Sequence, residues 1–167
     1  MAASTKNSVD QSMAHPPENP ATERPRPDDN ILVLVHMLSN RISNAFFAEL
    51  QSTLNLSVAE WRIILTLANR PNATAMEIST RWAMEKMTVS RAIRHLEELG
   101  WIQRHVKADD RRSYDLTLTA EGLKIYDQVL PVANNRYHEI VGELDKSELL
   151  QFQKTLIKLI GRTDDLL

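Results

Sequence analysis

The stretch that decides the fold is Lys86-Met-Thr-Val-Ser-Arg-Ala-Ile-Arg-His-Leu-Glu-Glu-Leu-Gly-Trp-Ile-Gln-Arg-His-Val106. Gly100 divides it, and glycine most readily takes the left-handed conformation that ends a helix. The residues after it, Trp101–Val106, have the composition of a strand. Before it, apolar residues recur at steps of three and four, which predicts one buried helical face: Val89, Ile93, Leu96 and Leu99.

The flanking sequence completes a recognisable unit. Tyr114–Thr119 alternates apolar and polar residues, as a strand with one buried face does, and the charged residues 107–112 are expected to form a hairpin loop. Upstream, Thr74-Ala-Met-Glu77 matches a capping box that opens a short helix, which is expected to end near Ala83. Two helices joined by a short turn and followed by a two-stranded hairpin make a winged helix-turn-helix.

Further helices are predicted on both sides of this unit. Ile31–Leu50 carries apolar residues at helical spacing, and Ser57-Val-Ala-Glu60 is a capping box for a helix that ends before Pro71. Thr119 and Asp145 are expected to cap two more helices. The outermost helices are too apolar to be covered by a small winged domain alone, so they need another surface.

Residues 1–28 differ from the rest of the chain. They hold five of the seven prolines and lack the apolar central stretch of a signal peptide. Such a composition cannot bury a core, so a disordered tail is expected.

Charge and composition exclude several classes of function. The chain has no cysteine, which excludes disulfide scaffolds and thiolate metal sites. Its net charge of −2 cannot attract nucleic acid by itself, but residues 86–112 hold seven Lys or Arg against four acids, a local surplus of three positive charges. No apolar run approaches the about 20 residues that span a bilayer. We therefore expect a cytoplasmic protein with no membrane partner.

Sequence signals for catalysis are lacking. The four glycines form neither a phosphate loop nor a dinucleotide fingerprint, and the five histidines show no metal-ligand spacing. An enzyme is therefore disfavoured, and no cofactor or metal is expected.

Double-stranded DNA is the predicted partner of the winged helix-turn-helix. The second helix of this motif enters the major groove, where Arg91 can bind a guanine or a phosphate, while Arg94 and Lys107 are better placed for phosphates. Arginine at the hairpin tip suits a narrow minor groove, and Asp110 is expected to orient Arg112. A solvated basic face and a protein-binding winged helix remain alternatives. The predicted DNA-contacting set is Lys86, Met87, Thr88, Ser90, Arg91, Arg94, Lys107, Asp110, Arg111 and Arg112.

From about Asn30 to Arg162 the chain resembles the MarR family of bacterial transcriptional regulators. The resemblance rests on Leu96-Glu-Glu-Leu-Gly-Trp-Ile-Gln-Arg104, Asp109-Asp-Arg-Arg112 and Leu116-Thr-Leu-Thr-Ala-Glu-Gly122. It implies a homodimer whose first and last helices interlock, with two wings and two recognition helices on a pseudo-palindromic operator. It also implies that Arg112 enters the minor groove with Asp110 as its partner.

The resulting fold class is mainly α with a small β-hairpin wing, a winged helix-turn-helix inside a helical homodimer. The expected segments are a Pro-rich tail (1–28), a dimerisation helix (29–56), the DNA-binding domain (57–118) and the C-terminal dimerisation helices (119–167).

The resemblance further implies a repressor that is released by a small aromatic acid, a phenol or a coenzyme A thioester. Arg41 stands where salicylate-binding relatives place an arginine and could pair with a carboxylate. His36 could add a hydrogen bond, and Trp61 could form an aromatic wall. Simpler explanations are an ion pair for Arg41, a satisfied histidine and a core tryptophan. A ligand-independent or partner-controlled DNA-binding regulator is the alternative function.

Overall fold

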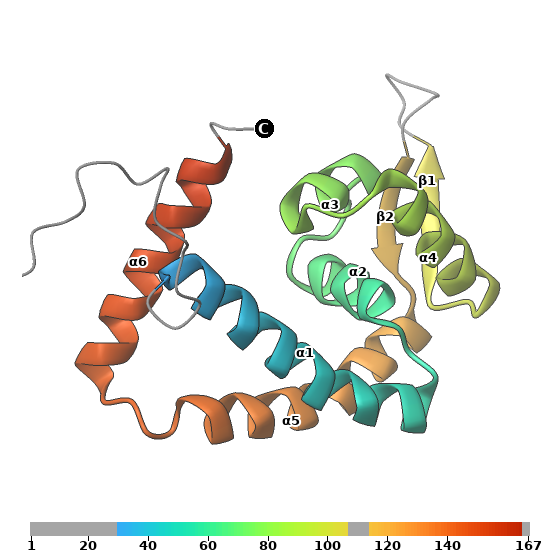
Figure 1. The fold of residues 1–167 in the computed structure, drawn as a ribbon. Coiled ribbons are helices and arrows are strands. Elements are labelled where there is room, and N and C mark those ends of the chain that lie inside the picture. The colour runs from blue at the N-terminus through green and yellow to red at the C-terminus, as the bar shows by residue number, and fades with distance from the viewer. Residues whose placement is uncertain (1–29, 107–113, 165–167) are drawn as a thin grey trace, which may run out of the picture. The chain divides into compact units, whose positions relative to one another are not determined.

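The computed structural model describes residues 30–106 and 114–164 of the chain. The described residues fall into two units, which divide between residues 40 and 41, within the first helix. The predicted tail, residues 1–28, lies outside the described residues. The element order agrees with the sequence prediction (Figure 1): α1 (Ile31–Leu54), α2 (Val58–Asn69), α3 (Ala75–Trp82), α4 (Lys86–Glu98), β1 (Ile102–Val106), β2 (Tyr114–Leu118), α5 (Ala120–Val141) and α6 (Lys146–Asp164).

Four helices, α2, α3, α5 and α6, begin at the predicted caps because polar side chains there satisfy amide groups that have no partner within the helix. Ser57 and Thr74 form complete capping boxes with Glu60 and Glu77. The hydroxyl of Thr119 accepts a hydrogen bond from the Gly122 amide at 3.1 Å. All these predicted helix starts are confirmed. Asp145 Oδ1 likewise accepts from the amides of Ser147 and Glu148 at the start of α6.

The core of the second unit lies where α2, α3 and α4 meet the hairpin and the first half of α5, which Figure 1 shows grouped together. β1 and β2 pair antiparallel, with Ile102 opposite Leu118 and Arg104 opposite Leu116. The loop before α3 joins this sheet through a bridge between Ala73 and Leu116. Apolar side chains from every one of these elements fill the centre: Ile63, Ile64, Leu67, Ile78, Val89, Leu96, Ile102, Leu116, Ile125 and Val129.

One predicted inward-facing residue of α4 does not face inward. Leu99 is 42% exposed, whereas Val89, Ile93 and Leu96 are buried. Leu99 is the C-cap of α4, and Gly100 takes a left-handed φ of 71° directly after it. The chain turns there, so the helical period no longer predicts which side is buried.

The outer helices expose many apolar side chains. No described residue of α6 is buried, and Leu150, Phe152, Ile157 and Ile160 are all exposed. By length and composition alone, α1 is apolar enough to cross a membrane, a test that signal sequences and the buried core helices of soluble proteins also pass; 6% of this apolar stretch of α1 is buried. Arg41 stands near the middle of α1. An arginine at the centre of a spanning helix costs about 2.5–3.5 kcal/mol, which disfavours insertion.

Candidate nucleic-acid interface

The turn between α3 and α4 is held by side-chain and backbone contacts. Ala83 ends α3 in the left-handed conformation, with φ 47° and ψ 44°. The buried Ser79 spans the turn, because its hydroxyl donates to the Met84 carbonyl at 2.7 Å and its carbonyl accepts from the Met84 amide at 3.0 Å. These contacts fix the start of α4 relative to α3, as a helix-turn-helix requires.

The two faces of α4 differ in chemistry. Val89, Ala92, Ile93 and Leu96 are buried. Of the predicted DNA-contacting residues on this helix, Met87 is 65% exposed and Thr88 is half-buried. The other four are exposed: Lys86, Ser90, Arg91 and Arg94.

The three cations of α4 are available to an external anion. Within the described part of the chain, none of Lys86, Arg91 and Arg94 forms an ion pair. Glu85, the N-cap of α4, makes no side-chain capping hydrogen bond, and the first turn contains no acid. The positive end of the helix dipole therefore adds to the cationic side chains.

A hollow of about 340 Å³ separates the start of α3 from α4 and the hairpin. Ser90 and Arg104 are among its lining residues. Arg104 pairs with Glu97 of α4 at 2.5 Å, and its guanidinium lies 5.7 Å from the centre of the Tyr114 ring. Arg104 and Glu97 both lie within residues 86–112, so their pairing leaves the local surplus of three positive charges unchanged, but it engages one of the seven cations. Arg104 thus joins β1 to α4.

The base of the hairpin is fixed to α5 by Thr119. Its amide donates to the Trp101 carbonyl at 3.0 Å, and its hydroxyl donates to the Gly100 carbonyl at 2.7 Å. Gly122 lies against the same backbone, since a Cβ there would be 2.0 Å from the Trp101 carbonyl oxygen. These contacts give a physical reason for the Leu-Thr-x-x-Gly part of the sequence pattern. The four predicted contacts nearer the hairpin tip lie outside the described residues: Lys107, Asp110, Arg111 and Arg112.

The three predicted effector-binding residues have different surroundings. His36 is exposed, and its Nε2 lies 3.1 Å from the Asn40 side-chain amide. Arg41 is also exposed. Trp61 is 5% exposed and packs in the core against Phe46 and Tyr126, with ring centres 5.9 and 6.1 Å away. A core role thus accounts for Trp61, and the effector role of all three residues stays a prediction.

A second hollow lies in the second unit, between residues 43–51 of α1 and the start of α2. It measures about 560 Å³, and its lining includes Phe47, Gln51 and Leu56 but neither Arg41 nor Trp61. In the described part of the chain, no group of three or more potential metal ligands is found.

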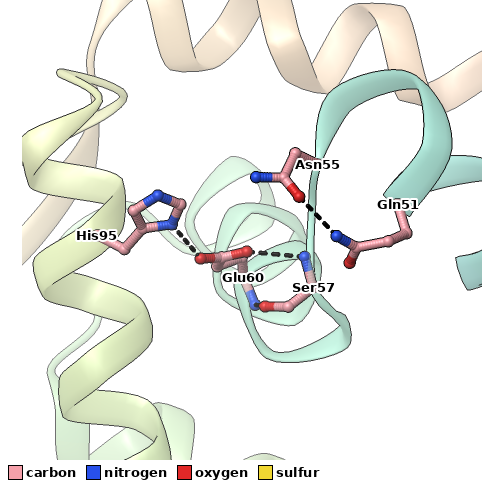
Figure 2. Close-up of polar contacts among 5 residues, drawn as sticks. All are labelled: Gln51, Asn55, Ser57, Glu60 and His95. Carbon is pink, nitrogen blue, oxygen red and sulfur yellow. Dashed lines mark hydrogen bonds and ion pairs between the residues drawn. The ribbon is translucent and has the colours of Figure 1, made fainter.

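One polar contact between α2 and α4 was not predicted from the sequence. Glu60, the acid of the first capping box, also contacts His95 through its second carboxylate oxygen (Figure 2). Burial raises the pKa of Glu60, but hydrogen bonds from Ser57 and His95 outweigh it and hold this pKa below its ordinary value of 4.5. The two residues are 35 positions apart, so no local pattern could reveal the pair.

Comparison with known proteins agrees with this geometry. A model of the MarR family matches residues 54–113. The transcriptional repressor MprA of Escherichia coli (strain K12) is 26% identical over 134 residues, covering 79% of this chain and 75% of that protein. The homoprotocatechuate degradative operon repressor of Escherichia coli is 20% identical over 130 residues, covering 78% and 88%. A solved MarR/EmrR family transcriptional regulator from Acinetobacter sp. ADP1 superposes with a TM-score of 0.77 at 26% identity, covering 84% of this chain and 99% of that one.

Proposed function

This chain belongs to the MarR family of transcriptional regulators, and from that premise we propose that it is a cytoplasmic, homodimeric repressor released by a small aromatic effector. The observation that carries the proposal is the exposed face of α4. Lys86, Arg91 and Arg94 there have no ion pair among the described residues, and α4 packs its opposite, apolar face into the core.

The chemistry of α4 supports a division of labour on DNA. Arg91 lies in the second turn, where a recognition helix meets base edges, and its fork of donors matches the O6 and N7 atoms of guanine. Lys86 and the uncapped amides beside it suit a phosphate. Arg94, one turn further along, suits the flanking backbone. Arg112 is proposed to enter the minor groove, with Asp110 orienting it.

A second copy of the chain is the proposed cover for the outer helices. Ile31, Leu32 and Leu34 of α1 are exposed, as are Ile157 and Ile160 of α6. Solvated side chains of this size and number are unfavourable in a soluble monomer, and a two-fold interface buries the same set twice. A symmetric pair would also present two α4 helices to a pseudo-palindromic operator.

The effector is proposed to be an aromatic acid, a phenol or a coenzyme A thioester. One relative is named as the repressor of a homoprotocatechuate degradative operon, and homoprotocatechuate is itself an aromatic acid. Arg41 is exposed and is the proposed carboxylate partner, with His36 and Trp61 as further candidates. For DNA affinity to fall by about tenfold, the effector needs to favour the dimer geometry that does not fit the operator by only about 1.4 kcal/mol.

Selection of duplexes from a randomised pool, followed by footprinting, tests the proposal. We expect a protected pseudo-palindrome of roughly 16–24 bp, with half-sites about one helical turn apart. Arg91→Ala and Arg112→Ala should each weaken binding by about 1–3 kcal/mol. Lys124→Ala, which removes an exposed cation from the start of α5, is the control and should not.

The effector is tested separately with salicylate and other aromatic acids as probes. Wild-type protein should gain thermal stability and lose duplex affinity when they are added, and Arg41→Ala should keep DNA binding but lose this response. Protection of a single half-site by a monomer would contradict the dimer. A full response in Arg41→Ala would place the pocket elsewhere, and no response to any probe would favour the ligand-independent regulator.

A further inference from the structure

The carboxylate of Glu60 lies where the first helix of the DNA-binding domain crosses the recognition helix. Glu60 is 7% exposed. Its Oε2 accepts from the Ser57 amide at 2.7 Å, and its Oε1 contacts Nδ1 of His95 (Figure 2). His95 belongs to the last turn of α4. One buried side chain therefore holds both the beginning of α2 and the end of α4.

The joint between α1 and α2 is built next to this carboxylate. Asn55 follows the last residue of α1 with a left-handed φ of 51°. Its side-chain oxygen accepts a hydrogen bond from Gln51 Nε2 at 2.6 Å, as Figure 2 shows. Leu56 comes next and is buried in the core. Only these two residues separate the end of α1 from Ser57, so little chain is available to absorb a shift of the joint before it reaches the Ser57–Glu60 cap.

We propose that Glu60 and His95 are positioning residues, which tie the orientation of the recognition helix to the α1–α2 joint. This role rests on the proposed function, because it requires α4 to enter the major groove. His95 lies nine residues from Lys86, about 14 Å along the helix axis at about 1.5 Å per residue. A tilt of about 5° at the His95 end would thus move the DNA-facing end by about 1 Å, more than the about 0.5 Å that a binding constellation tolerates.

The chemistry of the pair suits such a link. Movement of α4 would take His95 away from Oε1 of the buried Glu60, while Oε2 would keep the Ser57 amide. Losing a hydrogen bond at a buried carboxylate oxygen is costly, so the contact resists such a movement. Both helices also contribute apolar side chains to the core cluster, such as Ile64, Val89 and Leu96. Apolar packing is non-directional, whereas a hydrogen bond to a fixed carboxylate depends on angle as well as distance. The pair therefore specifies orientation where the apolar contacts supply stability.

The test compares duplex affinity with stability in four variants of the full chain. His95→Leu removes the donor, and His95→Gln restores one. Glu60→Gln keeps the capping box, in which glutamine substitutes for glutamate, but removes the charge that holds His95. Ile64→Val lowers stability in the same core but leaves both polar side chains of the pair in place. The probe is a duplex that the wild-type protein selected from a randomised pool, and its affinity is measured by fluorescence anisotropy. The temperature is one at which thermal unfolding shows every variant to be folded.

We expect His95→Leu to weaken affinity for the selected duplex by about tenfold or more, which corresponds to about 1.4 kcal/mol of binding free energy. His95→Gln and Ile64→Val should weaken it by no more than about threefold, or about 0.7 kcal/mol. Glu60→Gln should also weaken it, which keeps the test informative if His95→Leu does not fold. Affinity for an unselected duplex should stay unchanged in every folded variant, since phosphate contacts tolerate small tilts. The positioning role would be overturned if Glu60→Gln and the folded His95 variants bound the selected duplex as tightly as wild type. It would also be overturned if Ile64→Val lost as much affinity as His95→Leu and Glu60→Gln. Failure of the wild type to select any duplex would instead overturn the proposed function.

Discussion

Replacing Gly122 by alanine should damage the joint between the wing and α5. An added Cβ would lie 2.0 Å from the Trp101 carbonyl oxygen, 2.9 Å from its carbon and 3.3 Å from Leu118 Cδ2. Carbonyl atoms of a paired hairpin cannot rotate away as a flexible side chain can. The same carbonyl oxygen also accepts the Thr119 amide at 3.0 Å, so any shift that relieves the clash strains this hydrogen bond too.

The size of the effect follows from three contributions. Forcing extra volume into a packed site costs about 1–3 kcal/mol. Leaving the amide of the half-buried Thr119 and the Trp101 carbonyl without this hydrogen bond costs about 1–3 kcal/mol more. Alanine returns about 1 kcal/mol through its higher helix propensity. The net expectation is a loss of about 3 kcal/mol in the free energy of unfolding.

Urea unfolding followed by circular dichroism measures this loss, at one fixed protein concentration because an oligomer's stability depends on it. Gly161→Ala is the matched control. Gly161 lies inside α6 with nothing within 4 Å of an added Cβ, so this variant should gain about 0.5–1 kcal/mol. A Gly122→Ala protein as stable as wild type would refute the close approach of α5 to the hairpin.

Three further substitutions test other parts of the structure. Ala83→Gly should stabilise the protein by about 0.5–1 kcal/mol: it relieves about 1–2 kcal/mol of left-handed backbone strain, and the greater entropy of glycine in the unfolded chain offsets part of this gain. A clear loss of stability in urea unfolding would contradict the turn geometry. Ile64→Ala, at a side chain with 0% exposure, should cost about 2–5 kcal/mol by the same measurement, and a cost below about 1 kcal/mol would mean that this site is not core. Glu60→Gln should lower the free energy of unfolding near neutral pH. The difference from wild type should shrink as the pH falls below 4.5, the ordinary pKa of glutamate, and through the lower pKa of Glu60 in the folded protein. A difference that stays constant with pH would show that the Glu60 charge is not its source.

The parts of the fold that the sequence predicts well are those with local causes. Capping boxes at Ser57 and Thr74 join residues three positions apart, and the apolar period of α4 needs only its own residues. Leu99 is the informative failure, because the period continues to the end of the helix while the chain turns away at Gly100. A periodic pattern predicts which side of a helix is buried only as far as the helix continues.

The parts of the site that the sequence misses depend on contacts between elements. Glu97 and Arg104 are both visible as charges, but their pairing requires the turn at Gly100 to bring β1 back against α4. The local sequence predicts only a capping role for Glu60 and gives no partner for His95. Only the packing of α2 on α4 brings the two side chains together. Counting charges along a sequence therefore overstates the number of cations that remain for DNA.

The most direct test of the account is the composition of the complex with a selected duplex, measured by analytical ultracentrifugation together with the free protein. We predict that the free protein sediments as a dimer and that two chains bind one duplex through both α4 helices, with Arg91→Ala weakening the complex but leaving the free dimer intact. A folded monomer that binds one chain per duplex, or a folded protein that binds no duplex even at low salt, would contradict it.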